Sequence, residues 1–360
     1  MKKIALKLSL FVIPIIIYIF VGIFVDAYNV FHVDDIRFTY ATPNQNFIKT
    51  KYVLENKDTF NAFVLGSSRA GNFPEDYLPD KTESGKSLNW YNMTYAMGCV
   101  EENYMTVSTF IDNGIKVDAL VLFLDEISMY RNKTEGLDNL IFTTYQTYEE
   151  SPLKFYYSYI KQKPVLKLVP AVFENLSNKI HQEVNYLGQR NLFYSYGVDE
   201  RNVDMSIGSG SEMFESEAVF EYTDSSRTID ALRNLKALCQ SENIELYIVA
   251  TPLLKTTYVN AVSKGYLEFL SDASKVVDFY CFSGLNCYTM NPDYYFDASH
   301  FRPYVGKEME KVLFRTGKER DDALTAAENE YSLIKFGVKV TAENADEVIE
   351  CLRNEMLKAS

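Results

Sequence analysis

Short runs rich in apolar residues alternate along most of this chain with segments whose apolar residues recur at helical spacing. Continuous runs over Ala62–Leu65 and Ala119–Leu124 are typical of strands covered on both faces of a sheet, and further strands are predicted over Leu88–Met93, Leu246–Ala250 and Val276–Cys281. The helical segments are Glu101–Gly114, Ile229–Cys239, Leu254–Leu270 and the stretch from Pro303 to Leu313. This alternation predicts an α/β domain with a doubly wound, mostly parallel sheet.

The alternation stops between residues 128 and 225, where tyrosine and phenylalanine are frequent. We interpret 128–225 as an insertion that is helical in its first half and leaves the sheet near the edge where such folds bind ligands. Its aromatic side chains either stack on sugar rings or pack the insertion onto the sheet. Residues 318–360 form a polar, acidic, α-rich appendage with a short strand expected at Phe336–Val340.

An uncharged run over Leu8–Val25 follows three lysines near the start of the chain. Its eighteen residues would span about 27 Å as a helix, which is close to the hydrocarbon thickness of a bilayer. Lysines before the run and aspartates after it predict a cytoplasmic N-terminus and an extracytoplasmic remainder. The alternative is a signal peptide cleaved near Ala27. The run is long for a signal core, so we favour an uncleaved single-pass anchor in the cell membrane.

These patterns divide the chain into a cytoplasmic stub and anchor (1–26), a linker and leading helix (27–60), an α/β domain with its insertion (61–317), and the appendage (318–360). The net charge of −13 argues against nucleic-acid binding, which needs a basic surface. Five cysteines neither make a disulfide framework nor have zinc-ligand spacing with a nearby histidine. Cys281 and Cys287 either close a short loop or are buried thiols. No metal or organic cofactor is expected.

The stretch before the last helix of the α/β pattern contains one of only three histidines, His300, with Asp297 three positions before it. An imidazole that accepts a proton and a carboxylate that orients it are two members of a nucleophilic triad. A serine for the third position lies more than two hundred residues earlier, in Gly66-Ser67-Ser68 at the end of the first strand. In the alternative reading, Asp297 or Ser299 simply caps the last helix.

Gly66-Ser67-Ser68, together with Asp297-Ala298-Ser299-His300, resembles the motifs of the SGNH (GDSL-type) hydrolase superfamily. The resemblance implies an SGNH/flavodoxin-like three-layer fold with Ser68 as nucleophile, Asp297 as orienting acid and His300 as general base. Ser67 stands where the superfamily has an aspartate, and it remains an alternative nucleophile. The Gly-Ser-Ser variant with an N-terminal anchor is similar to the membrane-anchored branch that includes the teichoic acid D-alanine transfer and exopolysaccharide O-acetylation proteins.

The resemblance also implies oxyanion donors from the nucleophile's own N–H, from a glycine after the second strand and from an asparagine after the third. Gly98 matches the glycine, whereas Asp125 stands at the asparagine position. An ionised Asp125 would repel an oxyanion, so either Asn92 donates instead or Asp125 is a structural residue. Arg69 and Arg302 flank the two motifs, where they either bind an anionic substrate or carrier or form surface ion pairs.

The resemblance and the anchor together imply an extracytoplasmic serine acyltransferase or esterase that acts on O-acyl groups of a cell-envelope glycan. A sugar hydroxyl as acceptor makes the protein a transferase and water makes it an esterase; the anchor and the aromatic insertion favour transfer. The expected partners are an envelope polysaccharide or acyl carrier and, by analogy, a multispanning membrane acyltransferase. Asp125 motivates a second hypothesis, a degenerate glycan-binding or scaffold component. Cleavage near Ala27 would give a third, a soluble secreted esterase.

Overall fold

The computed structural model describes residues 2–33, 43–74, 78–134, 140–161, 173, 215, 218–222 and 226–359. The chain divides into two compact units. Unit 1 consists of Met1–Tyr52 and Thr134–Leu187, and unit 2 of Val53–Lys133 and Gly188–Ser360. Most of the predicted insertion beyond residue 161, and residues 34–42 of the predicted linker, lie outside the described residues.

Unit 2 is built on a six-stranded sheet with the strand order β2-β1-β3-β4-β5-β6. The first five strands run parallel, and β6 pairs antiparallel with β5. An α/β fold with a mostly parallel sheet is therefore confirmed. The strands are β1 (Ala62–Leu65), β2 (Trp90–Asn92), β3 (Ala119–Leu124), β4 (Glu245–Ala250), β5 (Phe279–Cys281) and β6 (Val338–Val340).

Helices connect these strands and cover the sheet. In unit 2 the described helices are η1 (Ser68–Asn72), α3 (Val100–Asp112), α4 (Glu126–Tyr130), α7 (Ser226–Glu242), α8 (Lys255–Ser263), α9 (Tyr266–Ser274), α10 (Cys287–Met290), η5 (Pro292–Tyr294), α11 (Pro303–Phe314), α12 (Lys318–Ala327) and α13 (Ala345–Ala359). As the sequence indicates, α3 ends just before Gly114, which has a φ of 81°, a conformation that glycine adopts at little cost.

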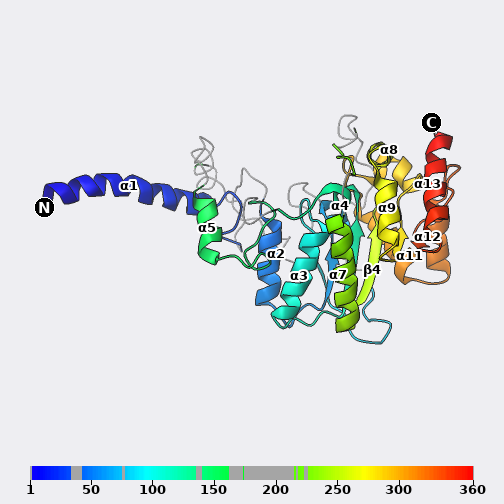
Figure 1. Ribbon diagram of the computed structural model, residues 1–360, viewed down its shortest axis with the longest axis horizontal. Coiled ribbons are helices and arrows are strands. Elements are labelled where there is room, and N and C mark those ends of the chain that lie inside the picture. The colour runs from blue at the N-terminus through cyan, green and yellow to red at the C-terminus, as the bar shows by residue number, and fades with distance from the viewer. Residues whose placement is uncertain are drawn as a thin grey trace. The chain divides into compact units, whose positions relative to one another are not determined.

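Strand β1 is packed between helices on both of its faces, because successive side chains of a strand point to opposite sides. On one face, the rings of Phe63 and Phe110 of α3 have centroids 5.0 Å apart, and Figure 1 shows α3 beside α7. On the other face, Val64 shares a buried core cluster with Val305 and Met309 of α11. Each such buried side chain contributes about 1.5–3 kcal/mol, so the end of β1 is firmly placed.

The helix predicted over Leu254–Leu270 is two helices, α8 and α9, so that prediction was wrong. Gly265 separates them with a φ of 101°, a conformation that L side chains rarely adopt. A Cβ atom on Gly265 would also lie 2.6 Å from the Cβ of Tyr222. The apolar spacing runs through the break, which is why a helical pattern alone does not reveal it.

The C-terminal segment, predicted as an α-rich appendage with a short strand, contributes that strand to the same sheet. Its strand β6 pairs with β5. In α13, the carboxylate of Glu355 accepts hydrogen bonds from the N–H groups of Leu285 (2.8 Å) and Leu333 (2.7 Å). Burial raises the pKa of Glu355 although these N–H groups act to lower it. A strand and a buried carboxylate therefore join this segment to the α/β core.

Unit 1 holds most of the described aromatic residues of the insertion's first half, whereas Tyr130 lies in unit 2. Phe155 and Phe47 are both fully buried, with ring centroids 4.7 Å apart. The amide of Asn44 donates to the Tyr159 hydroxyl at 2.7 Å. Phe155 and Tyr159 thus pack against the N-terminal segment within unit 1. The described helices of this unit are α1 (Lys2–Val25), α5 (Pro152–Ile160) and most of α2 (Gln45–Glu55).

The anchor predicted over Leu8–Val25 falls within α1, which has Pro14 in its interior. The side chains from Leu10 to Ile17 are exposed. Across the ranges that the structure describes, no helix combines the length and the apolar character needed to cross a membrane. The membrane anchor stays a prediction.

Candidate active site

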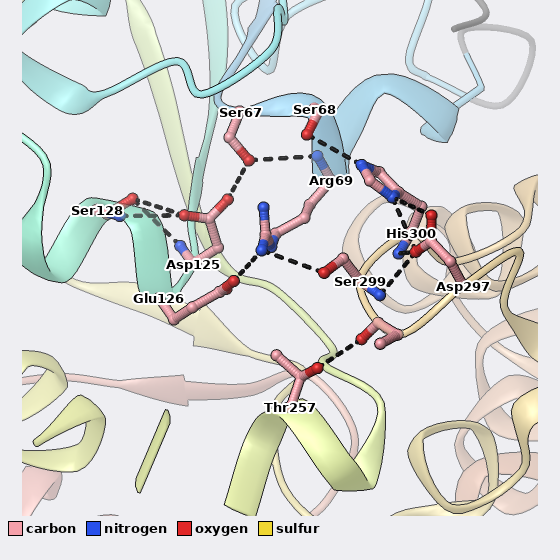
Figure 2. Close-up of polar contacts among 11 residues, drawn as sticks. Ser67, Ser68, Arg69, Asp125, Glu126, Ser128, Thr257, Asp297, Ser299 and His300 are labelled. Atoms are coloured by element: carbon pink, nitrogen blue, oxygen red, sulfur yellow. Dashed lines mark hydrogen bonds and ion pairs between the residues drawn. The ribbon is translucent and has the colours of Figure 1, made fainter. Parts of the chain in front are cut away.

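The residues predicted to form the site converge at the carboxyl-terminal edge of the parallel strands. Gly66-Ser67-Ser68 directly follows β1, and Asp125 directly follows β3. Parallel strands end at a common edge, and ligands bind there in such folds. The loop between η5 and α11 brings Asp297 and His300 to the same place, as Figure 2 shows.

Ser68, His300 and Asp297 form one hydrogen-bonded series (Figure 2). Nε2 of His300 lies 3.0 Å from the Ser68 Oγ, and Nδ1 lies 2.9 Å and 2.8 Å from Oδ1 and Oδ2 of Asp297. An ionised carboxylate can only accept hydrogen bonds, so it selects the tautomer with the proton on Nδ1. The lone pair of Nε2 then faces the Ser68 hydroxyl, as general-base activation of a serine requires.

The three side chains differ in their access to solvent. Ser68 is partly exposed, whereas His300 is only 3% exposed. A substrate can therefore reach the hydroxyl while the protein shields the imidazole from water. Shielding strengthens the electrostatic interaction between His300 and Asp297, because fewer water dipoles screen it.

Asp297 orders its own loop as well as the imidazole. Its Oδ1 accepts the N–H groups of Ser299 and His300, each at 2.8 Å. Burial acts to raise the pKa of the Asp297 carboxyl, but the hydrogen bonds and the charge of His300 outweigh burial and hold that pKa below its usual value. The reading in which Asp297 or Ser299 caps the last helix is wrong, because α11 has Arg302 as its N-cap, without a side-chain cap.

Ser67 makes contacts quite different from those of its neighbour. Its hydroxyl donates to the carboxylate of Asp125 and accepts the N–H of Arg69 at 3.2 Å, which caps η1. Ser67 is also only 1% exposed. The hydroxyl that meets His300 is that of Ser68, so the geometry favours Ser68 over Ser67 as nucleophile.

Asp125 is the N-cap of α4. Its Oδ1 accepts the N–H and the hydroxyl of Ser128 at 3.1 Å and 3.2 Å, and its Oδ2 accepts the Ser67 hydroxyl. The structure thus gives Asp125 a capping role, one of the two roles left open by the sequence. Ser67 and Asp125 therefore form one buried pair beside the nucleophile candidate.

The two other predicted oxyanion donors have structural contacts. Nδ2 of Asn92 donates to the Ala70 carbonyl at 3.3 Å, which ties the end of β2 to η1. The N–H of Gly98 donates to the Tyr95 carbonyl at 3.1 Å. A Cβ atom on Gly98 would lie 2.3 Å from the Gly66 carbonyl oxygen, so glycine permits this close approach. A role in the oxyanion hole stays a prediction for both residues.

Neither predicted arginine forms a surface ion pair, because each is only 3% exposed. The guanidinium of Arg69 pairs with the Glu126 carboxylate, and its Nη2 donates to the Ser299 Oγ at 3.2 Å. Arg302 donates from Nε to the Tyr295 carbonyl at 3.1 Å, and burial lowers its pKa. Both side chains therefore bond to protein groups in or next to the loop that carries Asp297 and His300.

Three further residues that the sequence analysis assigned no role contact the same region. Glu126 pairs with Arg69, and Nδ2 of Asn72 donates to the Phe301 carbonyl at 3.1 Å. The hydroxyl of Thr257 on α8 donates to the Ala298 carbonyl at 2.7 Å (Figure 2). Glu126 follows directly after Asp125, and that was its only sequence signal; no local pattern marks the other two.

The described residues contain no cluster of three or more His, Cys, Asp or Glu side chains able to hold a metal ion. All five cysteines are free, so Cys281 and Cys287 do not form a disulfide. Burial raises the pKa of the Cys281 thiol to about 12, and a protonated thiol is a poor nucleophile. The nucleophile that the site offers is therefore Ser68.

No protein-family model matches this chain, and no curated protein matches it. What unit 2 itself shows is an α/β fold with a serine, a histidine and an aspartate in series at the carboxyl edge of a mostly parallel sheet. That combination of fold and geometry is the basis for a functional assignment.

Proposed function

We propose that the protein is an SGNH-like serine acyltransferase or esterase that acts on O-acyl groups of a cell-envelope glycan. The observation that carries the proposal is the position of the His300 imidazole, within 3.0 Å of the Ser68 hydroxyl and 2.8 Å of the Asp297 carboxylate. The chain order Ser, Asp, His on a mostly parallel sheet supports the SGNH-like assignment in particular.

The reaction begins with attack of the Ser68 Oγ on the carbonyl carbon of an ester. As the new C–O bond forms, Nε2 of His300 takes the serine proton, and Asp297 stabilises the resulting imidazolium. The tetrahedral intermediate then expels the sugar or carrier oxygen, which receives that proton from His300. The products of this half are an acyl-Ser68 ester and a free hydroxyl.

The second half repeats these steps with a new acceptor. An acceptor hydroxyl loses its proton to His300 while its oxygen attacks the acyl-Ser68 carbonyl, and Ser68 regains the proton as it leaves. Water as acceptor gives hydrolysis, and a glycan hydroxyl gives transfer. We favour transfer, because the predicted anchor would hold the protein beside envelope glycans and a multispanning acyltransferase.

The N–H of Ser68, with Gly98 and Asn92 as the further candidate donors, forms the proposed oxyanion hole, which stabilises the charge that develops on the carbonyl oxygen. The alternative hypothesis of a degenerate, non-catalytic scaffold was based on repulsion between an ionised Asp125 and that oxyanion. Hydrogen bonds to the Asp125 carboxylate come instead from Ser67 and Ser128. We therefore retain the enzyme as the single proposal.

A fluorophosphonate probe tests the proposal on the full-length protein. Ser68 Oγ would bond to the probe's phosphorus, fluoride would leave, and His300 would take the serine proton. We expect the probe to label the native protein and not the Ser68→Ala variant. In His300→Ala, the rate of labelling should fall by about a hundredfold or more.

The matched control for these variants is Ser274→Ala. Ser274 is a buried serine of α9 that donates to the Ser271 carbonyl at 2.7 Å, and its removal is expected to leave labelling unchanged. Labelling that persists in Ser68→Ala, or its absence from the folded native protein, would contradict the proposal.

A further inference from the structure

The short turn that carries Ser68 also carries two side chains that hold the loop of His300. In η1, Nη2 of Arg69 donates to the Ser299 Oγ at 3.2 Å, and Nδ2 of Asn72 donates to the Phe301 carbonyl at 3.1 Å. Ser299 and Phe301 are the residues immediately before and after His300. The nucleophile's turn is thus bonded to the loop on both sides of the base.

We infer that Arg69 and Asn72 are positioning residues that keep the Ser68 hydroxyl and the His300 imidazole in register for proton transfer. The inference rests on the proposed function, since it assigns these residues a part in the same reaction. It does not make them catalytic residues, because the bonds that carry the inference run to Ser299 and to the Phe301 carbonyl, which do not react.

Arg69 is itself held rigidly. Its guanidinium is buried and pairs with the equally buried carboxylate of Glu126, the first residue of α4 after β3 (Figure 2). A buried, paired guanidinium presents its N–H groups in a fixed fork. The bond from Arg69 to Ser299 therefore fixes the loop of His300 relative to both η1 and the end of β3.

One residue, Ser299, is hydrogen-bonded to both Arg69 and Asp297. Ser299 accepts the Arg69 N–H with its hydroxyl and donates its own backbone N–H to Oδ1 of Asp297 at 2.8 Å. The same carboxylate holds Nδ1 of His300. Fixing Ser299 thus restricts both the carboxylate and the imidazole that it orients.

Asn72 holds the other side of the loop. It is 2% exposed, and its acceptor residue Phe301 forms an isolated antiparallel bridge with Tyr295, which closes the loop at its base. Thr257 adds a third bond at Ala298. The backbone around His300 is therefore tied at several points, while Nε2 of the ring is left to meet Ser68.

Such restraint matters because proton transfer between a hydroxyl and an imidazole depends steeply on distance and angle. Misplacing a reacting group by about 1 Å costs on the order of a hundredfold in rate. Because the bonds from Arg69 and Asn72 both start from the turn that bears Ser68, the loop of His300 should move together with that turn. The 3.0 Å separation of Oγ and Nε2 is then preserved.

The test measures the second-order rate constant of fluorophosphonate labelling in full-length Asn72→Leu and Ser299→Ala from about pH 5 to about pH 9, a range that spans histidine titration. Both variants leave the Arg69–Glu126 pair intact, and the Ser299→Ala variant keeps the backbone N–H that bonds to Asp297. We expect both rates to fall about tenfold to a hundredfold. The rise of the rate with pH, which reports base catalysis, should be flattened.

The matched control is Asn103→Leu. Asn103 is 1% exposed, and neither of its side-chain polar atoms has a hydrogen-bond partner within the described part of the chain. The Asn103→Leu and Asn72→Leu exchanges are identical, so thermal unfolding of both variants reports their general structural cost. We expect Asn103→Leu to label at the native rate with the native pH profile.

The outcomes separate this inference from the proposal on which it rests. Native labelling at Ser68 with native rates and pH profiles in Asn72→Leu and Ser299→Ala would overturn the positioning role and leave the proposed function standing. An equal loss in Asn103→Leu would also overturn it, as a general packing effect. Failure of the native protein to label at Ser68 would instead overturn the proposed function.

Discussion

Ser67 and Ser68 are adjacent in the chain, but their surroundings assign them different tasks. The Ser68 hydroxyl is partly exposed and meets His300. The Ser67 hydroxyl is buried and is used to bond Asp125 and the N–H of Arg69. A serine becomes a nucleophile only where a base receives its proton, so the neighbour, rather than the residue type, decides the role.

Asp125→Asn tests whether the carboxylate near the nucleophile turn opposes catalysis. Asparagine caps a helix about as well as aspartate, so the bonds around α4 and Ser67 should persist. We expect the rate constant of fluorophosphonate labelling to stay within about threefold of the native value.

The control for that variant is Asp118→Asn, which removes a buried carboxylate paired with Lys86 and Lys116, each at 2.9 Å. Asp118 lies just before β3, at the opposite end of the strand from Asp125. A rise of about tenfold or more in Asp125→Asn alone, equivalent to about 1.4 kcal/mol of barrier, would show that the Asp125 charge suppresses the reaction.

The proximity of Ser68, Asp297 and His300 could be predicted because their sequence signals are local. Asp297 and His300 are three positions apart, and Ser68 follows a recognisable strand. Glu126, Asn72 and Thr257 could not be predicted in the same way. Each acts through a partner dozens to hundreds of residues away in the chain, and a single sequence carries no record of such contacts.

At the scale of elements, the apolar pattern predicted β1 and β3 well because every residue of these two strands is buried. The bounds of β1 and β3 agree with the predicted runs. It failed at Gly265, where one predicted helix is two. It also could not show that β6 pairs with β5, because strand partners are chosen by long-range packing.

The break at Gly265 follows α8, whose Thr257 donates to the Ala298 carbonyl in the loop of His300. Gly265→Ala forces an L residue into a φ of 101° and brings a Cβ to 2.6 Å from Tyr222. We expect a loss of about 1–2 kcal/mol for the backbone and about 1–3 kcal/mol more for the overpacking.

Urea unfolding of Gly265→Ala and Gly114→Ala measures the overpacking cost, as the difference between the losses of unfolding free energy in the two variants. Gly114 has a φ of 81° and no atom within 4 Å of the place where its Cβ would lie, so it reports the backbone cost alone. Equal destabilisation of the two variants would show that Tyr222 moves aside freely and that the break does not depend on this contact.

At the scale of the whole molecule, the chain combines an α/β unit that holds the candidate site with a second unit formed by the N-terminal segment and the insertion's first half. The aromatic side chains of the insertion were difficult to assign from sequence, because stacking on a ligand and packing in a core use the same residues. In the described part, Phe155 and Tyr159 are buried in unit 1.

The localisation proposal predicts that the full-length protein sediments with membranes, stays there in high salt and is released by detergent. Replacing exposed Ile16 and Ile17 of α1 by lysine should shift the protein to the soluble fraction, because a charge at the centre of a span costs about 2.5–3.5 kcal/mol. Recovery of a shortened soluble form that begins near Ala27 would contradict the anchor.

The central claim is that the Ser68 hydroxyl, activated by His300, is the nucleophile. The most direct measurement identifies the residue that carries the phosphonyl group, by peptide mass spectrometry of the probe-labelled full-length protein. We expect modification of Ser68 alone, and at least about a hundredfold slower modification in the His300→Ala protein. Modification of Ser67, or of a residue outside the site with Ser68 unmodified, would contradict it.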